Sequence, residues 1–139
     1  MARSTITLDI LTPQGAKRSG VECPGVEVPG IAGELGILPD HVPFITPVLP
    51  GVVRFRDGDS SERLAIGAGF LEVTGEGRVS ILTERALGPS EIDLAAVSER
   101  LKDVSAALSK EAGPIDAIDH RKLTNEQLWL EAQQRAVAG

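Results

Sequence analysis

The start of the chain alternates apolar and polar residues in the way that is typical of a half-buried β-strand. Ile6, Leu8 and Ile10 fall on one face of residues 5–10, because successive side chains of a strand point to opposite sides. Residues 12–15 contain a proline and a glycine and end this segment. The pattern therefore predicts a strand followed by a turn.

Two further stretches have short apolar runs on both sides of a glycine-containing turn. They are residues 52–66, with Gly58 in the turn, and residues 70–82, with Gly75 and Gly77 in the turn. Glycine accepts the positive φ that a tight hairpin turn needs. Several short strands at this spacing favour an antiparallel β-sandwich or barrel.

The composition changes near residue 88. Of the 15 glycines and nine prolines, thirteen and seven lie at or before Gly88, whereas the rest of the chain is rich in Ala, Glu, Gln and Leu. This change predicts two parts: an all-β domain over residues 1–88 and a helical hairpin over residues 89–139.

The first predicted helix has a start signal and a narrow apolar stripe. Ser90, followed three residues later by Asp93, is typical of a capped helix start. Residues 111–114 stop this helix, and Pro114 is well placed to open the next one. The stripe suits a single helical partner and consists of Leu94, Val97, Leu101, Val104 and Leu108.

The second predicted helix carries its apolar residues in two sectors. One sector is Leu128, Trp129, Ala132 and Ala136, and the other is Leu123, Leu130 and Val137. Two interpretations remain open: this helix touches two surfaces or changes neighbours, or both sectors are buried together.

Composition and charge exclude several classes of function. The 139 residues suffice for one dominant core, and a net charge of −6 with scattered Lys and Arg makes nucleic acid an unfavourable partner. No apolar stretch approaches the roughly 20 residues of a membrane span, so direct membrane insertion is not expected, and no signal segment follows Met1. The single cysteine, Cys23, excludes an internal disulfide and fits a reducing cytoplasm.

Residues 30–44 form the densest motif. Their glycines superficially resemble a phosphate loop, but Pro39 and Pro43 forbid the helix that such a loop requires. The glycines and prolines instead predict an irregular exposed loop from which Glu34 and His41 project. Such a loop is a candidate docking surface.

Candidate chemistry elsewhere is weak. Asp40-His41 lacks an activated nucleophile, and Asp116, Asp119 and His120 lack a further metal ligand. A solvated helix end explains the second group better. We therefore predict no catalytic residue and no metal site.

Two motifs in the first part carry a family resemblance. They are residues 28–51, with Gly33-Glu34-Leu35-Gly36-Ile37-Leu38-Pro39 and His41-x-Pro43, and residues 67–83, with Gly67-Ala68-Gly69-Phe70-Leu71-Glu72-Val73. In order and spacing these motifs resemble the epsilon subunit family of bacterial F-type ATP synthases. Chain length and the helical end agree, so the resemblance covers essentially the whole chain.

The resemblance implies a non-catalytic central-stalk subunit with a ten-stranded antiparallel β-sandwich and two C-terminal α-helices. The sandwich would bind the gamma subunit and the c-ring, with Glu34, Leu35, Gly36 and His41 facing the ring. The helices would inhibit ATP hydrolysis when they extend toward the alpha and beta subunits. The implied location is peripheral, on the cytoplasmic face of the bacterial plasma membrane.

One departure from the family concerns nucleotides. Members that bind ATP between the helices have an arginine where this chain has Ala96, so tight ATP sensing and a resident cofactor are not expected. Ile92, Asp93 and Arg135 remain as candidate contacts for weak nucleotide binding. The alternative from another class is a free-standing small-molecule-binding β-sandwich with a helical lid.

Overall fold

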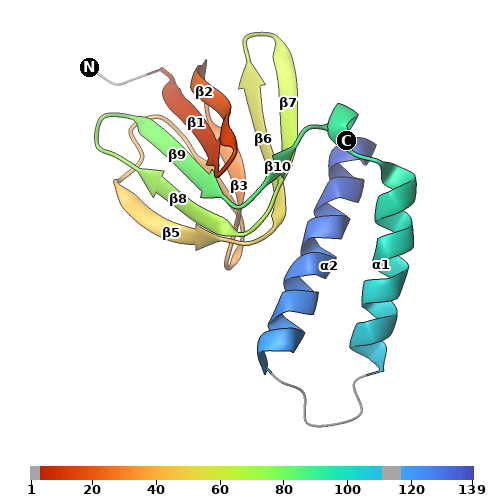
Figure 1. Ribbon diagram of the computed structural model, residues 1–139. Coiled ribbons are helices and arrows are strands. Elements are labelled where there is room, and N and C mark those ends of the chain that lie inside the picture. The colour runs from red at the N-terminus through yellow and green to blue at the C-terminus, as the bar shows by residue number, and fades with distance from the viewer. Residues whose placement is uncertain (1–3, 111–116) are drawn as a thin grey trace.

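The computed structural model describes residues 4–110 and 117–139. In these ranges a strand-rich first part is followed by a pair of helices (Figure 1). The strands are β1 (Ile6–Thr12), β2 (Gly15–Cys23), β3 (Val26–Gly30), β4 (Gly33–Ile37), β5 (Phe44–Val48), β6 (Gly51–Asp57), β7 (Ser60–Ile66), β8 (Gly69–Val73), β9 (Arg78–Thr83) and β10 (Ala86–Leu87). The helices are the short 3₁₀ helix η1 (Pro89–Glu91), α1 (Leu94–Ser109) and α2 (Ala117–Ala138). The predicted fold class is confirmed.

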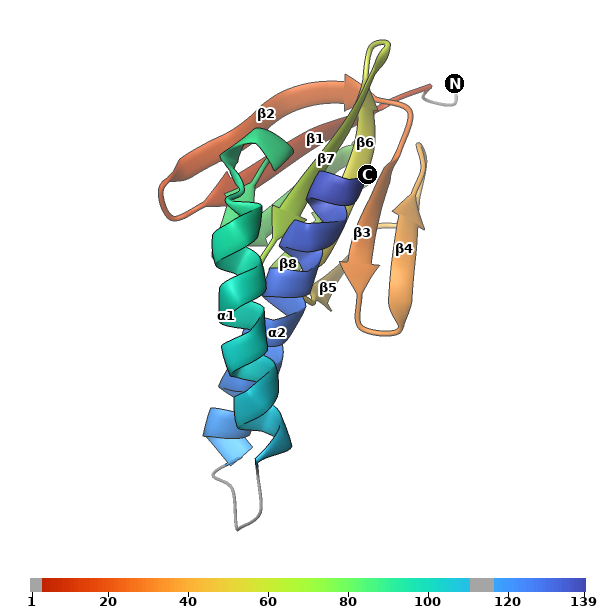
Figure 2. The ribbon, with the colours of Figure 1, turned by 90° about the vertical axis from the view of Figure 1, so that its right-hand side faces the viewer.

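The strands form one continuous sheet that folds over into two layers. Its order is β10-β7-β6-β3-β5-β8-β9-β1-β2, with β4 paired to β3. A single residue pair, Gly30 with Val48, links β3 to β5. The described pairings are antiparallel except for β1 with β9, two neighbouring strands that are far apart in the sequence and that no hairpin joins. Figure 2 shows the helices along the outer face of the layer that contains β6 and β7.

The sandwich core lies between the layers and is almost entirely aliphatic. Strand alternation turns Leu8, Ile10, Leu64, Leu71 and Ile81 inward, where they are fully buried. Burial of each such side chain contributes about 1.5–3 kcal/mol. The predicted apolar face of residues 5–10 therefore belongs to the main core.

The hairpin turns lie where the glycines predicted them. Asp57 pairs with Ser60 around Gly58, whose φ is 62°, and Val73 pairs with Val79 around a turn in which Gly77 has a φ of 79°. Both values lie in the left-handed region that favours glycine.

The expectation of an irregular loop after residue 30 is wrong for its first half. Residues 33–37 form strand β4, which pairs with β3 along its whole length. Gly33 has a φ of 121°, and a Cβ at Gly30 would lie 2.9 Å from the carbonyl oxygen of Gly33. The two glycines thus make a tight β3–β4 turn, and cross-strand pairing overrides the weak strand propensity of the segment.

The start of the first helix also differs from the prediction. Ser90 lies within η1, and the Asp93 side chain caps α1 by accepting a hydrogen bond from the Ala96 amide at 3.2 Å. Leu94 of the predicted stripe is exposed, whereas Val97 and Val104 are buried. The predicted helix stop, Pro114 and Asp116 lie outside the described residues.

Helix α2 packs against two different surfaces. Trp129, Ala132 and Ala136 contact the sandwich, while Leu130 packs against Val97 and Val104 of α1. Leu123 joins the contacts between the helices. Of the two interpretations of the sectors, the two-surface one is confirmed.

Candidate functional site

The predicted docking residues lie on β4 and in the turn that follows it. Glu34 and Gly36 are exposed, and Leu35 is half-buried against the edge of the core. Glu34 pairs opposite Pro29, beside the β3–β4 turn. The carboxylate of Glu34 is therefore available to a polar partner without entering a pocket.

His41 is held more firmly than expected. It is half-buried, and its ring packs on Phe44 with the centroids 5.0 Å apart. Its Nδ1 lies 2.9 Å from the carbonyl oxygen of Val42, to which it donates in the tautomer with hydrogen on Nδ1. The preceding Asp40 has a φ of 65°, so a tight turn fixes this end of the segment. No hydrogen bond or ion pair joins Glu34 to His41 among the described residues.

An exposed apolar row crosses the sandwich layer that carries no helix. Leu11, Leu82, Phe70 and Pro47 are direct cross-strand neighbours on β1, β9, β8 and β5. Phe70 is 55% exposed and Leu82 49% exposed. We call these four residues the outer row. A contiguous apolar patch of this kind is typical of a protein interface.

The sequence held a signal for the outer row that was missed. Phe70-Leu71 and Ile81-Leu82 are pairs of adjacent large apolar residues in strands that otherwise alternate. One member of each pair is buried in the core, so the other must face outward. An apolar residue at an outward position of a strand indicates a contact surface.

The helices are attached to the sandwich by a small apolar interface. Val52 and Ala65 form a cross-strand pair on the outer face of β6 and β7, and the Trp129, Ala132 and Ala136 face of α2 packs on them. The guanidinium carbon of Arg85 lies 4.5 Å from the centre of the Trp129 ring. This cation–π contact adds to the burial of the indole.

A second arginine of the sandwich contacts the end of α2. Arg63 of β7 donates from Nε to the carbonyl oxygen of Ala136 and from a terminal nitrogen to that of Val137, at 3.5 Å. Helix C-termini carry unpaired carbonyls and partial negative charge, which a guanidinium complements.

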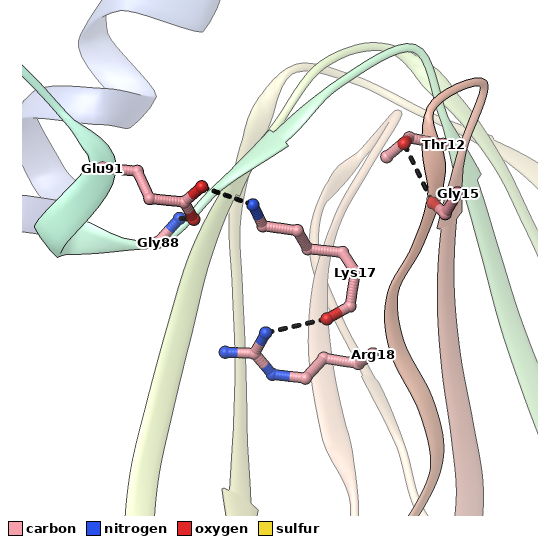
Figure 3. A network of polar contacts seen from close by, with 6 residues as sticks. All are labelled: Thr12, Gly15, Lys17, Arg18, Gly88 and Glu91. Atoms are coloured by element: carbon pink, nitrogen blue, oxygen red, sulfur yellow. Dashed lines mark hydrogen bonds and ion pairs between the residues drawn. The ribbon is translucent and has the colours of Figure 1, made fainter.

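The junction between the two parts is also fixed (Figure 3). Lys17 of β2 donates to Glu91 of η1 at 2.6 Å, and the other carboxylate oxygen of Glu91 accepts from the Gly88 amide at 2.9 Å. The hydrogen bond from Lys17, followed by that from Gly88, holds the pKa of Glu91 below its usual value. Glu91 thus ties the start of the tail to the β1–β2 hairpin.

Polar contacts also join the two helices. Arg100 of α1 donates two hydrogen bonds to the carboxylate of Glu126 on α2, at 2.7 and 3.0 Å. This forked pairing lowers the pKa of Glu126 and raises that of Arg100. The helices therefore form a unit with its own contacts.

The candidate nucleotide residues lie at the start of α1 and near the end of α2. Ile92 packs against the apolar cluster between α2 and the sandwich and against the cluster between the two helices. Asp93 caps α1, and Arg135 is exposed near the end of α2. A surface pocket of the sandwich lies elsewhere, between β3, β4 and β6, with Glu27, Gly36, Leu38, Arg54 and Arg56 in its lining.

Other candidate chemistry is not assembled in the described residues. Asp119 and His120 are exposed on α2, and no group of three or more potential metal ligands occurs in this part of the chain. None of the described helices is long and apolar enough to span a membrane. The architecture is a β-sandwich with exposed faces and a helical tail packed on one side.

Comparison with known proteins identifies the family. Residues 5–89 match the family described as "ATP synthase, Delta/Epsilon chain, beta-sandwich domain". The ATP synthase epsilon chain of Alkalihalophilus pseudofirmus is 43% identical over 91 residues, covering 66% of this chain and 67% of that one. The epsilon chain of Magnetococcus marinus is 33% identical over 135 residues, covering 97% and 96%. This chain therefore belongs to the ATP synthase epsilon-chain family.

A solved structure has the same fold. A chain of the Euglena gracilis mitochondrial ATP synthase, from a structure of its OSCP, F1 and c-ring, aligns with a TM-score of 0.83 at 20% identity, covering 99% of this chain and 84% of that one. An identity this low bears on the fold alone. The family is that of a non-catalytic subunit, so the prediction that this chain is not an enzyme in its own right is confirmed.

Proposed function

We propose that this chain is a coupling subunit of the rotor, which links the gamma subunit to the c-ring and inhibits ATP hydrolysis through its helical tail. The proposal rests on one observation: the apolar core of the sandwich is separate from the apolar contacts of the tail. The main core draws its buried residues from the sandwich alone, and the tail adds a second, smaller interface on the outside. A rigid body with a detachable arm suits a rotor part that also regulates.

Two exposed surfaces of the sandwich support the choice of partners. The outer row offers gamma an apolar face, and the segment with Glu34, Leu35, Gly36 and His41 offers the c-ring a polar one. In this proposal the subunit lies on the cytoplasmic face of the bacterial plasma membrane, held there by protein contacts. The tail, once extended, reaches the alpha and beta subunits.

Truncation of the tail tests the regulatory half of the proposal. A chain that ends at Gly88 keeps every residue of the main core cluster. We expect the complex assembled with it to synthesise ATP with normal coupling and to hydrolyse ATP faster than the complex with the full chain. Equal hydrolysis with both chains would remove the inhibitory role.

Surface variants test the coupling half. Glu34→Ala and Phe70→Glu should weaken attachment to the c-ring and to gamma, respectively, which pull-down of each variant with the purified partner measures. Glu76→Ala, at an exposed position of the β8–β9 turn outside both surfaces, is the matched control. Exposed positions usually change folding stability by less than about 0.5 kcal/mol, so a loss of binding in a folded variant locates the interface.

A further inference from the structure

We infer that Arg63 is the latch of the helical tail: it holds the last turn of α2 on the sandwich, and loss of this contact is the step that frees the tail. The inference rests on the proposed function, because it assigns a residue to the docked state of the regulatory arm. The outer row and the Glu34 segment play no part in it.

The argument begins with the unpaired groups at the end of α2. An α-helix leaves its last four carbonyls without partners inside the helix, and here they belong to residues 135–138. The amide of Gly139 donates to the Arg135 carbonyl at 3.0 Å, and Arg63 donates to the carbonyls of Ala136 and Val137. Two of the four carbonyls thus depend on a side chain of strand β7.

The chemistry of arginine suits this position. A guanidinium presents its donors in a planar fork, so one side chain can reach two successive carbonyls. Its positive charge is also attracted by the partial negative charge of the helix C-terminus. The contact is half-buried, where such interactions are less screened by solvent. When the tail leaves, both carbonyls and the guanidinium must exchange these bonds for water.

The apolar part of the interface between α2 and the sandwich is small, so the hydrogen bonds of Arg63 make up a large share of the docking contacts. Apart from Trp129, the buried partners are Val52, Ala65, Ala132 and Ala136, which are small side chains, and the partly buried Leu87 and Ile92 pack against them. Arg85 lies over Trp129 and therefore acts on the middle of α2, not on its end. Arg63 is the sandwich side chain that donates to the helix terminus within the described ranges.

The adjacent strand offers a matched control. Arg54 of β6 is the direct cross-strand neighbour of Arg63 and carries the same charge. Among the described residues it makes no hydrogen bond to α2. Arg54→Ala therefore removes a charge from the same face without touching the latch.

The test uses the full isolated chain and measures tail docking directly. Hydrogen exchange of the amides of residues 129–138 reports release of α2, and Trp129, the only tryptophan, reports it by fluorescence. We expect Arg63→Ala to raise the released fraction about tenfold, the usual weight of hydrogen bonds to a charged group, and Arg63→Lys to raise it less. Arg54→Ala should leave it unchanged.

Three results would overturn the latch. They are unchanged exchange of residues 129–138 in Arg63→Ala, an equal effect of Arg54→Ala, and an equal loss of protection in β1 and β9, which would indicate a general role in folding. Because the assay needs no other subunit, it separates failure of the latch from failure of the proposed function. A working latch in a tail that does not affect hydrolysis would refute the regulatory proposal and leave the latch intact.

Discussion

The β-sandwich and the helical tail bury their apolar residues in different ways. The sandwich closes two layers over one aliphatic core in which Leu8, Leu64, Leu71 and Ile81 are fully buried. The tail has two thin interfaces instead, one between its helices and one against the outside of β6 and β7. A single large core favours all-or-none unfolding, whereas thin interfaces allow local release.

The two parts also use charge differently. In the sandwich, Asp9 accepts from Arg78 and from the Gly20 amide, which fixes neighbouring strands. The tail, in contrast, is contacted by three charged side chains of the sandwich, Lys17, Arg63 and Arg85, which bind helical residues. When the tail is released, these polar groups can form hydrogen bonds with water instead, whereas apolar core side chains gain no such replacement. The difference shows how one chain combines a rigid body with a movable arm.

The largest expected effect on the stability of the sandwich comes from a cavity in the main core. Leu71→Ala should reduce the free energy of unfolding by about 2–5 kcal/mol, because the buried side chain loses its transfer energy and leaves a void. Urea denaturation measures this loss. Phe70→Ala, next to it on the exposed face, is the control and should cost far less. Similar losses for the two variants would contradict the placement of the core.

The second prediction concerns Trp129, the largest side chain of the docking interface. Trp129→Ala should undock the tail, because removal of a buried tryptophan costs about 3–5 kcal/mol and the rest of that interface is small. Hydrogen exchange should show loss of protection in α2 and retained protection in β1 and β9. Leu94→Ala, at an exposed position of α1, serves as the control. Loss of protection throughout the chain would show that sandwich and tail form one core.

The sequence predicted those features of both regions that depend on local chemistry. Gly58 and Gly77 located hairpin turns because their conformations need glycine, and the two apolar sectors of α2 indicated its two surfaces as one of two interpretations. Strand β4 was missed because its pairing with β3, not its own propensity, makes it a strand.

Contacts between distant residues could not be predicted. Arg63 and Ala136 are 73 positions apart, and nothing in either segment indicates the other. The helix cap was predicted at Ser90 because the serine has the right spacing. In the structure Ser90 belongs to η1, and α1 begins only after Asp93, which caps it. Between them, Ile92 packs against the apolar cluster of α2 with the sandwich and against the cluster between the helices. The candidate roles of Glu34 and His41 remain predictions, since they depend on partners.

The third prediction concerns binding of ATP by the helical tail. We expect weak or undetectable ATP binding by the isolated chain, because Ala96, which is exposed in the first turn of α1, supplies no charged donor to a phosphate. Ala96→Arg should strengthen binding by about 1–3 kcal/mol if the guanidinium reaches a phosphate. Calorimetry at millimolar ATP measures both, with Ala96→Gln as the uncharged control. Micromolar affinity in the unaltered chain would show that other residues supply the contact.

The smallest expected effect is a pH dependence of the contact between the helices. Glu126 has a lowered pKa because Arg100 donates hydrogen bonds to it, so its contribution to stability is fully present above the unfolded value, about 4.3, and is lost as the pH falls through the lowered one. Arg85 acts on Glu126 in the same direction, and Asp103 adds to the field at Arg100. The pair is partly exposed, so the change should be small.

Hydrogen exchange of α1 amides between neutral pH and about pH 3.5, corrected for intrinsic exchange rates, should show protection falling on acidification. In Glu126→Gln that part of the fall should disappear, while the contributions of other carboxylates, including Glu91, persist in both proteins. The difference between the two profiles therefore isolates the Arg100–Glu126 pair. Identical profiles would show that the Arg100–Glu126 pair adds nothing measurable, and that the apolar cluster around Val97, Val104 and Leu130 holds the helices together without it.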